Sequence, residues 1–218
     1  MKSKEVFIKS PVSKISMDRR KPLQGVGVND ANYAVTATIN GTRTMCPYYR
    51  TWHNMIHRCY NPNYKRANIT YEDCTVYEDW HTFSTFSKWM GSQDWEGKVL
   101  DKDLLIRSNK MYSPDTCIFL RPALNSSLIE GHKARGNYLV GVSRYTEGGK
   151  YIANLSRGKS STNSHLGSFP TEIEAHNTWR IAKSKQLLEA ANNEVDVRVV
   201  DALRVRANEL LVLTPNVF

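Results

Sequence analysis

Four polar side chains between residues 101 and 125 are of types that could hold a metal ion and move a proton. They are Asp101, Lys102, Thr116 and Asn125, with 15 residues from Asp101 to Thr116 and nine from Thr116 to Asn125. Carboxylate and amide oxygens can bind a hard divalent cation, and an amine can transfer a proton. Hydrolysis of a phosphodiester needs such groups to converge on one phosphate.

These residues lie in a segment whose pattern predicts a strand, a long polar loop, a second strand and a helix. The segment is "VLDKDLLIRSNKMYSPDTCIFLRPALN", residues 99–125. The first strand carries Asp101, Thr116 opens the second strand, and the helix begins near Pro122. These elements must pack together if Asp101 and Asn125 are to act at one phosphate.

The lead-in to this segment predicts a hairpin and two helices. "NYAVTATINGTRT" alternates around Asn40-Gly41, which predicts a β-hairpin over residues 32–44. "NPNYKRANIT" predicts a loop, and "EDWHTFSTFSKWM" predicts an aromatic-rich helix. "PYYRTWHNMIHRCY" predicts a helix from Pro47 with one apolar stripe of Tyr49, Trp52, Met55, Ile56 and Cys59.

The block from Asp101 to Asn125 resembles the HNH nuclease family in its H-N-N form, as found in phage homing endonucleases. The lead-in "YRTWHNMIHRCYNP…CTVYEDWHTFSTFSKWM" is similar to that of phage-encoded HNH proteins. The resemblance implies a ββα-metal fold in which Asp101 and Asn125 hold Mg²⁺ or Mn²⁺. It places Lys102 at the position of the general-base histidine and Thr116 at that of the asparagine that braces the loop.

Lys102 is the main departure from this motif. A lysine that is protonated at neutral pH cannot accept a proton, so we expect weak cleavage. Burial beside a divalent cation would lower its pKa and free the lone pair; alternatively, the charged side chain would clamp the scissile phosphate. Asp103, His81 and His132 are other bases, but the sequence places none of them near the metal. Thr116 can still hydrogen-bond a loop through its hydroxyl.

Four cysteines fall in the first 117 residues: Cys46, Cys59, Cys74 and Cys117. No pair has the tight C-x2-C spacing of a strong zinc site, and a reducing compartment disfavours disulfides. Two interpretations stay open. The thiols are buried as small apolar groups, or all four bind a structural Zn²⁺ ion.

The C-terminal half predicts a small sheet followed by helices. "YLVGVSRY", "GKYIANLSR" and "SHLGSF" read as three short strands. Thr171 and Glu174 form the capping-box pattern at the start of a long helix. The apolar stripe that we predict for this helix consists of Ile173, Trp179, Ile181, Ala182, Leu187 and Leu188.

The strings "GVSRY", "KYIANL" and "LGSFPTEIEAHNTW" resemble the AP2 DNA-binding domain over about 50 residues. The resemblance implies a three-stranded sheet laid in the major groove, with the helix behind it. The DNA contacts that it implies are Arg144, Lys150, Tyr151, Asn154 and Arg157. Arginine can bind guanine and asparagine can bind adenine, whereas Lys150, Lys159 and His165 would contact phosphate.

The charge of the chain agrees with a nucleic-acid partner. The formal net charge is +9, and residues 131–191 contain nine Lys or Arg against four Asp or Glu. A basic surface is typical of nucleic-acid binding, although ribosome or membrane-surface binding, or solubility alone, would also use it. No apolar run approaches the roughly 18 residues of a membrane span, and the N-terminus lacks a signal-peptide block. We therefore expect no membrane partner and a cytoplasmic location, in the host cell if the chain is phage-encoded.

Together these features predict an α+β protein with a degenerate HNH ββα-metal module followed by an AP2-like three-stranded sheet plus helix. The expected divisions are a flexible basic arm over 1–31, the HNH-like module over 32–130, the AP2-like domain over 131–193, and a C-terminal helix and tail over 194–218.

The function that we expect is that of a metal-dependent endonuclease acting on double-stranded DNA. One alternative is a catalytically silent phage DNA-binding or regulatory protein on the same scaffold. Another is an inhibitor whose basic surface binds an acidic protein partner. The sequence predicts no oligomeric state.

Overall fold

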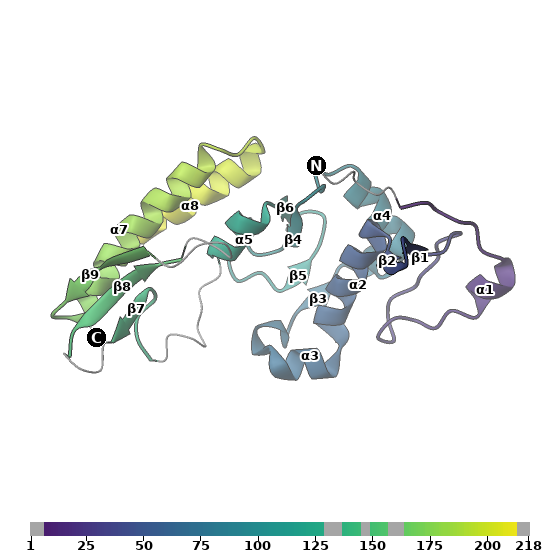
Figure 1. Cartoon of the computed structure of the whole chain (residues 1–218), viewed down its shortest axis with the longest axis horizontal. Helices are drawn as coiled ribbons and strands as arrows, with labels where there is room; N and C mark the ends of the chain where they lie inside the picture. The colour runs from purple at the N-terminus through teal and green to yellow at the C-terminus, as the bar shows by residue number, and fades with distance from the viewer. Residues whose placement is uncertain (1–6, 129–136, 145–148, 157–163, 213–218) are drawn as a thin grey trace. The chain divides into compact units, whose positions relative to one another are not determined.

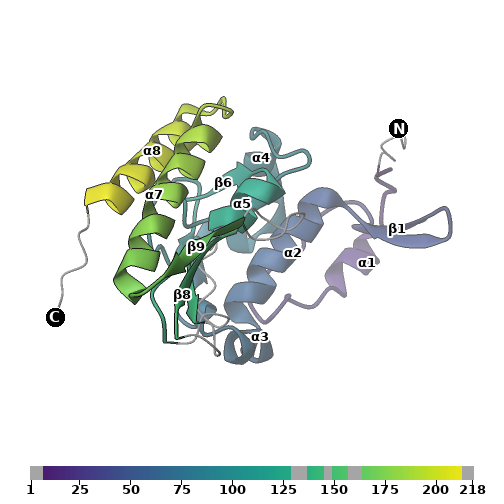
Figure 2. The ribbon, with the colours of Figure 1, turned by 60° about the vertical axis from the view of Figure 1, so that its left-hand side comes forward.

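The computed structural model of the chain describes residues 7–128, 137–144, 149–156 and 164–212. Helices and strands are mixed along the chain, so the α+β class is confirmed. They fall into two compact units, the first comprising residues 1–96 and 100–119 and the second residues 97–99 and 120–218. Figures 1 and 2 show the elements from two directions.

Two aromatic-rich helices build the core of the first unit. They are α2 (Pro47–Tyr60), with Pro47 in its first turn as predicted, and α4 (Phe83–Gly91). The apolar face of α2 buries Trp52, Met55, Ile56 and Cys59, as the 3.6-residue period requires. The helix predicted over residues 78–90 is divided into η2 (Glu78–His81) and α4, because Thr82 between them is extended. The Trp52 indole donates to the carbonyl of Trp80 over 2.7 Å and so joins α2 to η2.

Short strand pairs surround this core. β1 (Thr36–Ile39) pairs antiparallel with β2 (Thr42–Met45). The turn between them places Asn40 and Gly41 at φ 49° and 76°, the backbone that an Asn-Gly hairpin turn requires. β3 (Thr75–Val76) runs parallel to β5 (Met111–Tyr112). β4 (Val99–Asp101) pairs with β6 (Ile118–Leu120).

The loop predicted over residues 61–70 is wrong. This segment forms α3 (Pro62–Ala67), followed by the 3-10 turn η1 (Ile69–Tyr71). The Asn61 side chain caps α3 by accepting from the amide of Tyr64 over 2.9 Å. Asn61 and Pro62, which suggest a turn in the sequence, are the N-cap and the first residue of this short helix.

Residues 7–31 differ from the flexible basic arm that we predicted. The segment includes α1 (Lys14–Asp18), and Val28 forms a parallel bridge with Thr82 before α4. The Arg20 guanidinium donates to the carbonyl of Ala31 over 2.6 Å, and Ala31 is part of the core. The Arg20 side chain thus stabilises the backbone conformation of this segment.

In the second unit, a three-stranded sheet packs on helix α7 (Glu172–Ala191). The strands are β7 (Val142–Arg144), β8 (Tyr151–Leu155) and β9 (Ser164–Phe169), antiparallel in that order. The Thr171–Glu174 capping box is confirmed. The core between sheet and helix consists of Val142, Ala153, Leu155, Ala175 and Trp179.

The apolar stripe predicted for α7 is partly wrong. Trp179 and Leu187 are buried, but Ile173, Ile181 and Leu188 are 41%, 64% and 38% exposed. α7 also packs along α8 (Val197–Val212). Its buried surface therefore includes small and polar side chains that a search for large apolar residues passes over: Ala175, Arg180, Lys183, Ser184 and Ala191.

The boundary between the units lies near residue 119, whereas we predicted one at residue 130. Helix α5 (Pro122–Leu128) belongs to the second unit. The buried ammonium of Lys183 donates to the carbonyl of Ser127 over 2.5 Å. Arg121 forms a 2.7 Å ion pair with Glu194, which precedes α8. These contacts join α5, α7 and the predicted tail in one unit. The helices that the structure describes include none long and apolar enough to cross a membrane.

Candidate functional site

The loop between β4 and β5 opens with a turn capped by Asp101. Oδ1 of Asp101 accepts from the amide of Asp103 over 2.9 Å and from that of Leu104 over 2.7 Å. A carboxylate that accepts backbone amides two and three residues ahead stabilises a turn. One of the two oxygens of the carboxylate that the HNH resemblance assigns to a metal ion is therefore used by the backbone of its own loop.

Lys102 points into the first unit and is only 6% exposed. Its ammonium donates to Oδ1 of Asp103 over 2.6 Å and to the carbonyl of Asn109 over 2.7 Å. The rings of Tyr71 and Tyr112 lie 5.8 and 5.9 Å from the nitrogen, within the range of cation–π attraction. Oxygen atoms and aromatic rings thus surround the charge.

The pKa of Lys102 is raised above its ordinary value. Burial alone would lower it, but the hydrogen bond and the charge of Asp103 outweigh burial, and Cys74 and Tyr71 add to the rise. A general base needs the opposite shift, because it must be neutral to accept a proton. Lys102 is accordingly a charged structural group at neutral pH.

Asn109 braces this loop, and sequence reasoning missed it. Its Nδ2 donates to the carbonyl of Lys102 over 2.9 Å and to that of Met111 over 2.6 Å. Its Oδ1 accepts from the amide of Met111 over 3.1 Å. The available signal was the pair Ser108-Asn109, since both residue types are frequent in turns; Ser108 has φ 58°.

Thr116, assigned by resemblance to the bracing position, holds a different turn. Its hydroxyl donates to the carbonyl of Met111 over 2.8 Å and accepts from the amide of Ser113 over 3.1 Å. Thr116 and Asn109 therefore both donate to Met111, at the end of the loop.

Asn125, His81 and His132 are the remaining candidates for the metal site. Asn125 is half-buried on α5 in the second unit, whereas Asp101 belongs to the first. The ring of His81 is hydrogen-bonded to the Tyr60 hydroxyl over 3.0 Å, and His132 lies outside the described residues. Within the described part of the chain, no three His, Cys, Asp or Glu side chains are grouped to hold a metal ion.

The four cysteines are buried free thiols. Cys59 and Cys74 donate to the carbonyls of Thr75 and Thr70 over 3.8 and 3.5 Å. Burial raises the pKa of Cys59 to about 12 and that of Cys117 to about 12. Apolar burial favours the neutral thiol over the thiolate that binds zinc.

One face of the sheet in the second unit is polar. The register aligns Ser143 with Ile152 and Ile152 with Ser168, and it aligns Asn154 with His165. The Asn154 amide donates to the Ser143 hydroxyl over 3.3 Å, which places both on the same face. The alternate residues Val142 and Ala153 pack toward α7. The polar face, defined as Ser143, Ile152, Asn154, His165 and Ser168, therefore points away from α7.

The remaining residues assigned to DNA by resemblance lie elsewhere. Arg144 pairs with Tyr151 across the strands, on the face that carries Val142, and its guanidinium lies 5.6 Å from the Tyr151 ring. Tyr151 is half-buried against the core, so we interpret it as a packing residue. Lys150 is exposed before β8. Arg157 and Lys159 lie outside the described residues.

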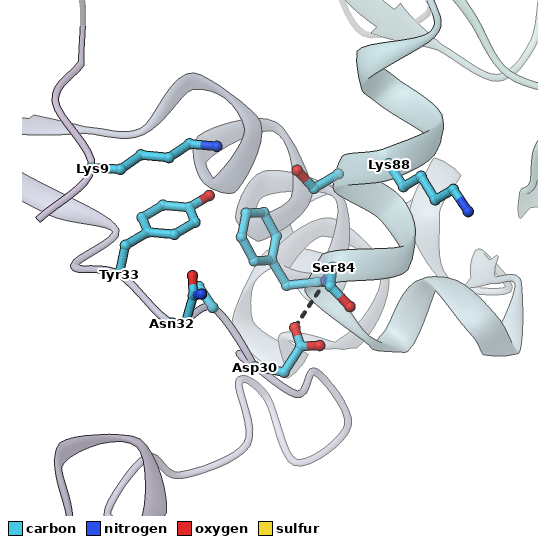
Figure 3. Close-up of a pocket in the computed structure, with 9 residues that line it drawn as sticks. Lys9, Asp30, Asn32, Tyr33, Ser84 and Lys88 are labelled. Atoms are coloured by element: carbon cyan, nitrogen blue, oxygen red, sulfur yellow. Dashed lines mark hydrogen bonds between the residues drawn. The ribbon is translucent and has the colours of Figure 1, made fainter. Parts of the chain in front are cut away.

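A pocket of about 470 Å³ opens between the N-terminal segment and α4. Lys9 and Tyr33 line one side, and Ser84 and Lys88 the other (Figure 3). The Asp30 carboxylate accepts from the amide of Ser84 over 2.9 Å and so already caps α4. Lys88 points away from Lys9 in Figure 3, so the two ammonium groups do not converge on one ligand.

Comparisons of the chain with family models, with curated proteins and with solved structures gave no significant match.

Proposed function

We propose that this protein binds double-stranded DNA through the polar face of the β7–β9 sheet, without cleaving it. The observation that carries the proposal is the row of Ser143, Asn154 and His165 on a face that points away from α7. Asparagine can bind adenine through two hydrogen bonds, and serine can bind either a donor or an acceptor. The three residues lie on three adjacent strands, so the row that they form runs across the sheet and suits neighbouring contacts in one groove.

Charge supports the same partner. The chain has a formal net charge of +9. Arg144, on the opposite face of the sheet, and Lys150, before β8, are exposed. Exposed basic side chains on the same small sheet as a row of hydrogen-bonding groups suit DNA, since phosphates are bound by charge and bases by hydrogen bonds. The AP2 resemblance leads independently to this sheet as the DNA-reading surface.

Lys102 is the reason to propose binding without cleavage. Its ammonium is buried, paired with Asp103 and bonded to the Asn109 carbonyl. Oδ1 of Asp101 caps the adjacent turn. A positive charge held in this loop opposes a divalent cation there. These residues do not fit a Mg²⁺ or Mn²⁺ site, and we derive no catalytic step through a metal ion.

A metal-dependent nuclease is the second candidate. The observation that favours it is the chain order of β4, β6 and α5, with Asp101 at the end of β4 and Asn125 in α5. The HNH resemblance assigns the metal to these two residues. A metal ion alone can stabilise the leaving oxygen of a phosphodiester, so the absence of a histidine base would slow cleavage without preventing it.

DNA binding can be tested by selecting duplexes from a random pool and measuring affinity by fluorescence anisotropy. We expect Asn154→Ala to weaken binding to the selected duplex by about tenfold, since a bidentate base contact contributes roughly 1–3 kcal/mol. Affinity for unrelated duplexes should change little. Asn208→Ala, at an exposed position on α8, is the matched control. If the native protein binds no duplex at low salt, the proposal is wrong.

Cleavage can be tested with supercoiled plasmid and Mg²⁺ or Mn²⁺. We expect no nicking by the native protein or by Lys102→His. Divalent-ion-dependent nicking that Asp101→Ala and Asn125→Ala abolish would replace the proposal with the second candidate. Both variants should retain DNA binding if the sheet supplies it.

A further inference from the structure

The loop between β4 and β5 exposes Ile106, the residue that we call its tip, and is closed by hydrogen bonds at its base. We propose that Ile106, at this tip, inserts between adjacent base pairs of bound duplex DNA, while Arg107 and Lys110 contact the flanking phosphates. This inference rests on the proposed DNA binding and adds a second contact surface, in the first unit.

The base of the loop is fixed by side chains from both of its ends. Lys102 binds the carbonyl of Asn109, and Asn109 binds the carbonyl of Lys102. Asp101 caps the first turn, and Leu104 is anchored in the interior with 2% of its surface exposed. A loop held in this way loses little conformational freedom when it binds a partner.

The tip is apolar and accessible. Ile106 is 51% exposed, and Met111, where the loop returns, is 45% exposed. Single exposed apolar side chains are ordinary on protein surfaces. Here, however, the exposed side chain lies within a loop whose base is held by the buried ammonium of Lys102, so the position of Ile106 is fixed by hydrogen bonds and an ion pair.

The charges of the loop select the partner. Between Leu104 and Pro114 the charged residues are Arg107 and Lys110, both basic and both exposed. The ammonium of Lys110 also donates to the carbonyl of Thr70 over 3.2 Å, which leaves two of its protons for a phosphate. Asp103, three residues before Ile106 in the sequence, is paired with Lys102. The branched apolar side chain of Ile106 suits the space between two stacked base pairs, and the basic side chains beside it suit the phosphates on either side. Proteins that insert such wedges unstack bases and bend the duplex.

The experiment uses the full chain and a duplex selected by it, in versions that carry one 2-aminopurine at successive positions. Fluorescence of this base rises when stacking is lost, and end-labelled duplexes report bending by energy transfer. We expect the native protein to raise fluorescence at one step and to bend the duplex by about 20–90°. Ile106→Ala should lose both signals while binding less than tenfold more weakly. Ile106→Leu should keep them.

Ile15→Ala is the matched control, because Ile15 is 64% exposed on α1 in the same unit. It should behave as the native protein does. If the native protein binds the duplex without a fluorescence change, or if Ile106→Ala keeps the full change, the wedge is refuted and the proposed function stands. Failure of the native protein to bind any duplex refutes both proposals.

Discussion

Lys102 and Asn109 hydrogen-bond each other in both directions across the loop that separates them. The ammonium of Lys102 donates to the backbone carbonyl of Asn109 over 2.7 Å, and the side-chain amide of Asn109 donates to the backbone carbonyl of Lys102 over 2.9 Å. Each residue thus fixes the backbone of the other. The position at which the HNH resemblance expects a proton acceptor holds a donor that closes the loop.

Replacing Lys102 with methionine should destabilise the first unit. Methionine keeps the length of the side chain but leaves the carbonyl of Asn109 without its donor and removes the charge that pairs with Asp103. Loss of such a buried partner costs about 1–3 kcal/mol in the free energy of unfolding. The measurement is urea denaturation followed by tryptophan fluorescence. Lys88→Met is the control, because Lys88 is exposed on α4 of the same unit. Equal denaturation midpoints for the two variants would contradict the structural role of Lys102.

Replacing Ser108 with glycine should stabilise the protein. Ser108 has φ 58°, a conformation in which a side chain is crowded by the backbone, whereas glycine adopts it without that penalty. Glycine also loses more freedom on folding, so the net gain should not exceed about 1 kcal/mol. Thermal unfolding of the two proteins measures the difference. Ser92→Gly is the control, because Ser92 has φ −88° and should lose stability. A lower melting temperature for Ser108→Gly would show that the serine side chain has a role of its own.

The cysteines should be unreactive in the folded protein near neutral pH. The pKa of Cys59 and that of Cys117 are raised from 9.0 to about 12 by burial, so the folded state favours the protonated thiol. Their contribution to stability is complete below pH 9 and is lost as the pH rises toward about 12. We expect a thiol reagent at pH 8 to label these two residues only after urea is added. A Cys59→Ala, Cys117→Ala double variant should lose less stability between pH 9 and 12. One zinc ion per chain in the purified protein would instead assign the thiols to a metal site.

DNA affinity should fall steeply with salt. Each phosphate bound by Lys or Arg releases condensed counterions, so about five contacts give a slope of roughly −4 to −5 in log affinity against log salt. Arg144→Ala and Lys150→Ala should each make the slope shallower by about one. Lys14→Ala, on α1 of the first unit, should leave it unchanged. An affinity that is constant from low to physiological salt would exclude phosphate binding.

Elements with strong local signals were predictable from the sequence. Asn40-Gly41 specifies its turn through backbone preference alone, and Thr171 with Glu174 specifies the start of α7 through a cap that involves adjacent residues. Pro47 marks the start of α2 for the same kind of reason. Each of these signals lies within four residues of the feature that it determines.

Tertiary contacts explain what the sequence did not predict. Ile181 fits the helical period but is exposed, because α7 directs small and polar residues toward the sheet and α8. One hydrogen-bond partner of Lys102, the carbonyl of Asn109, lies seven residues away. No local signal in the sequence specifies the path of the loop between them. The boundary near residue 119 likewise follows from the contacts within each unit rather than from a local signal.

The bridge between Val28 and Thr82 has a consequence for how the protein is made. Val28 donates to the carbonyl of His81 over 2.8 Å and accepts from the amide of Phe83 over 3.0 Å, so its partners are synthesised more than 50 residues later. At a synthesis rate of roughly 5–20 residues per second, the ribosome adds these partners about 3–10 s after Val28. The N-terminal segment is therefore translated before α4 but can dock only after it. A nascent chain stopped before α4 should leave residues 7–31 open to protease, and one stopped well beyond it should protect them.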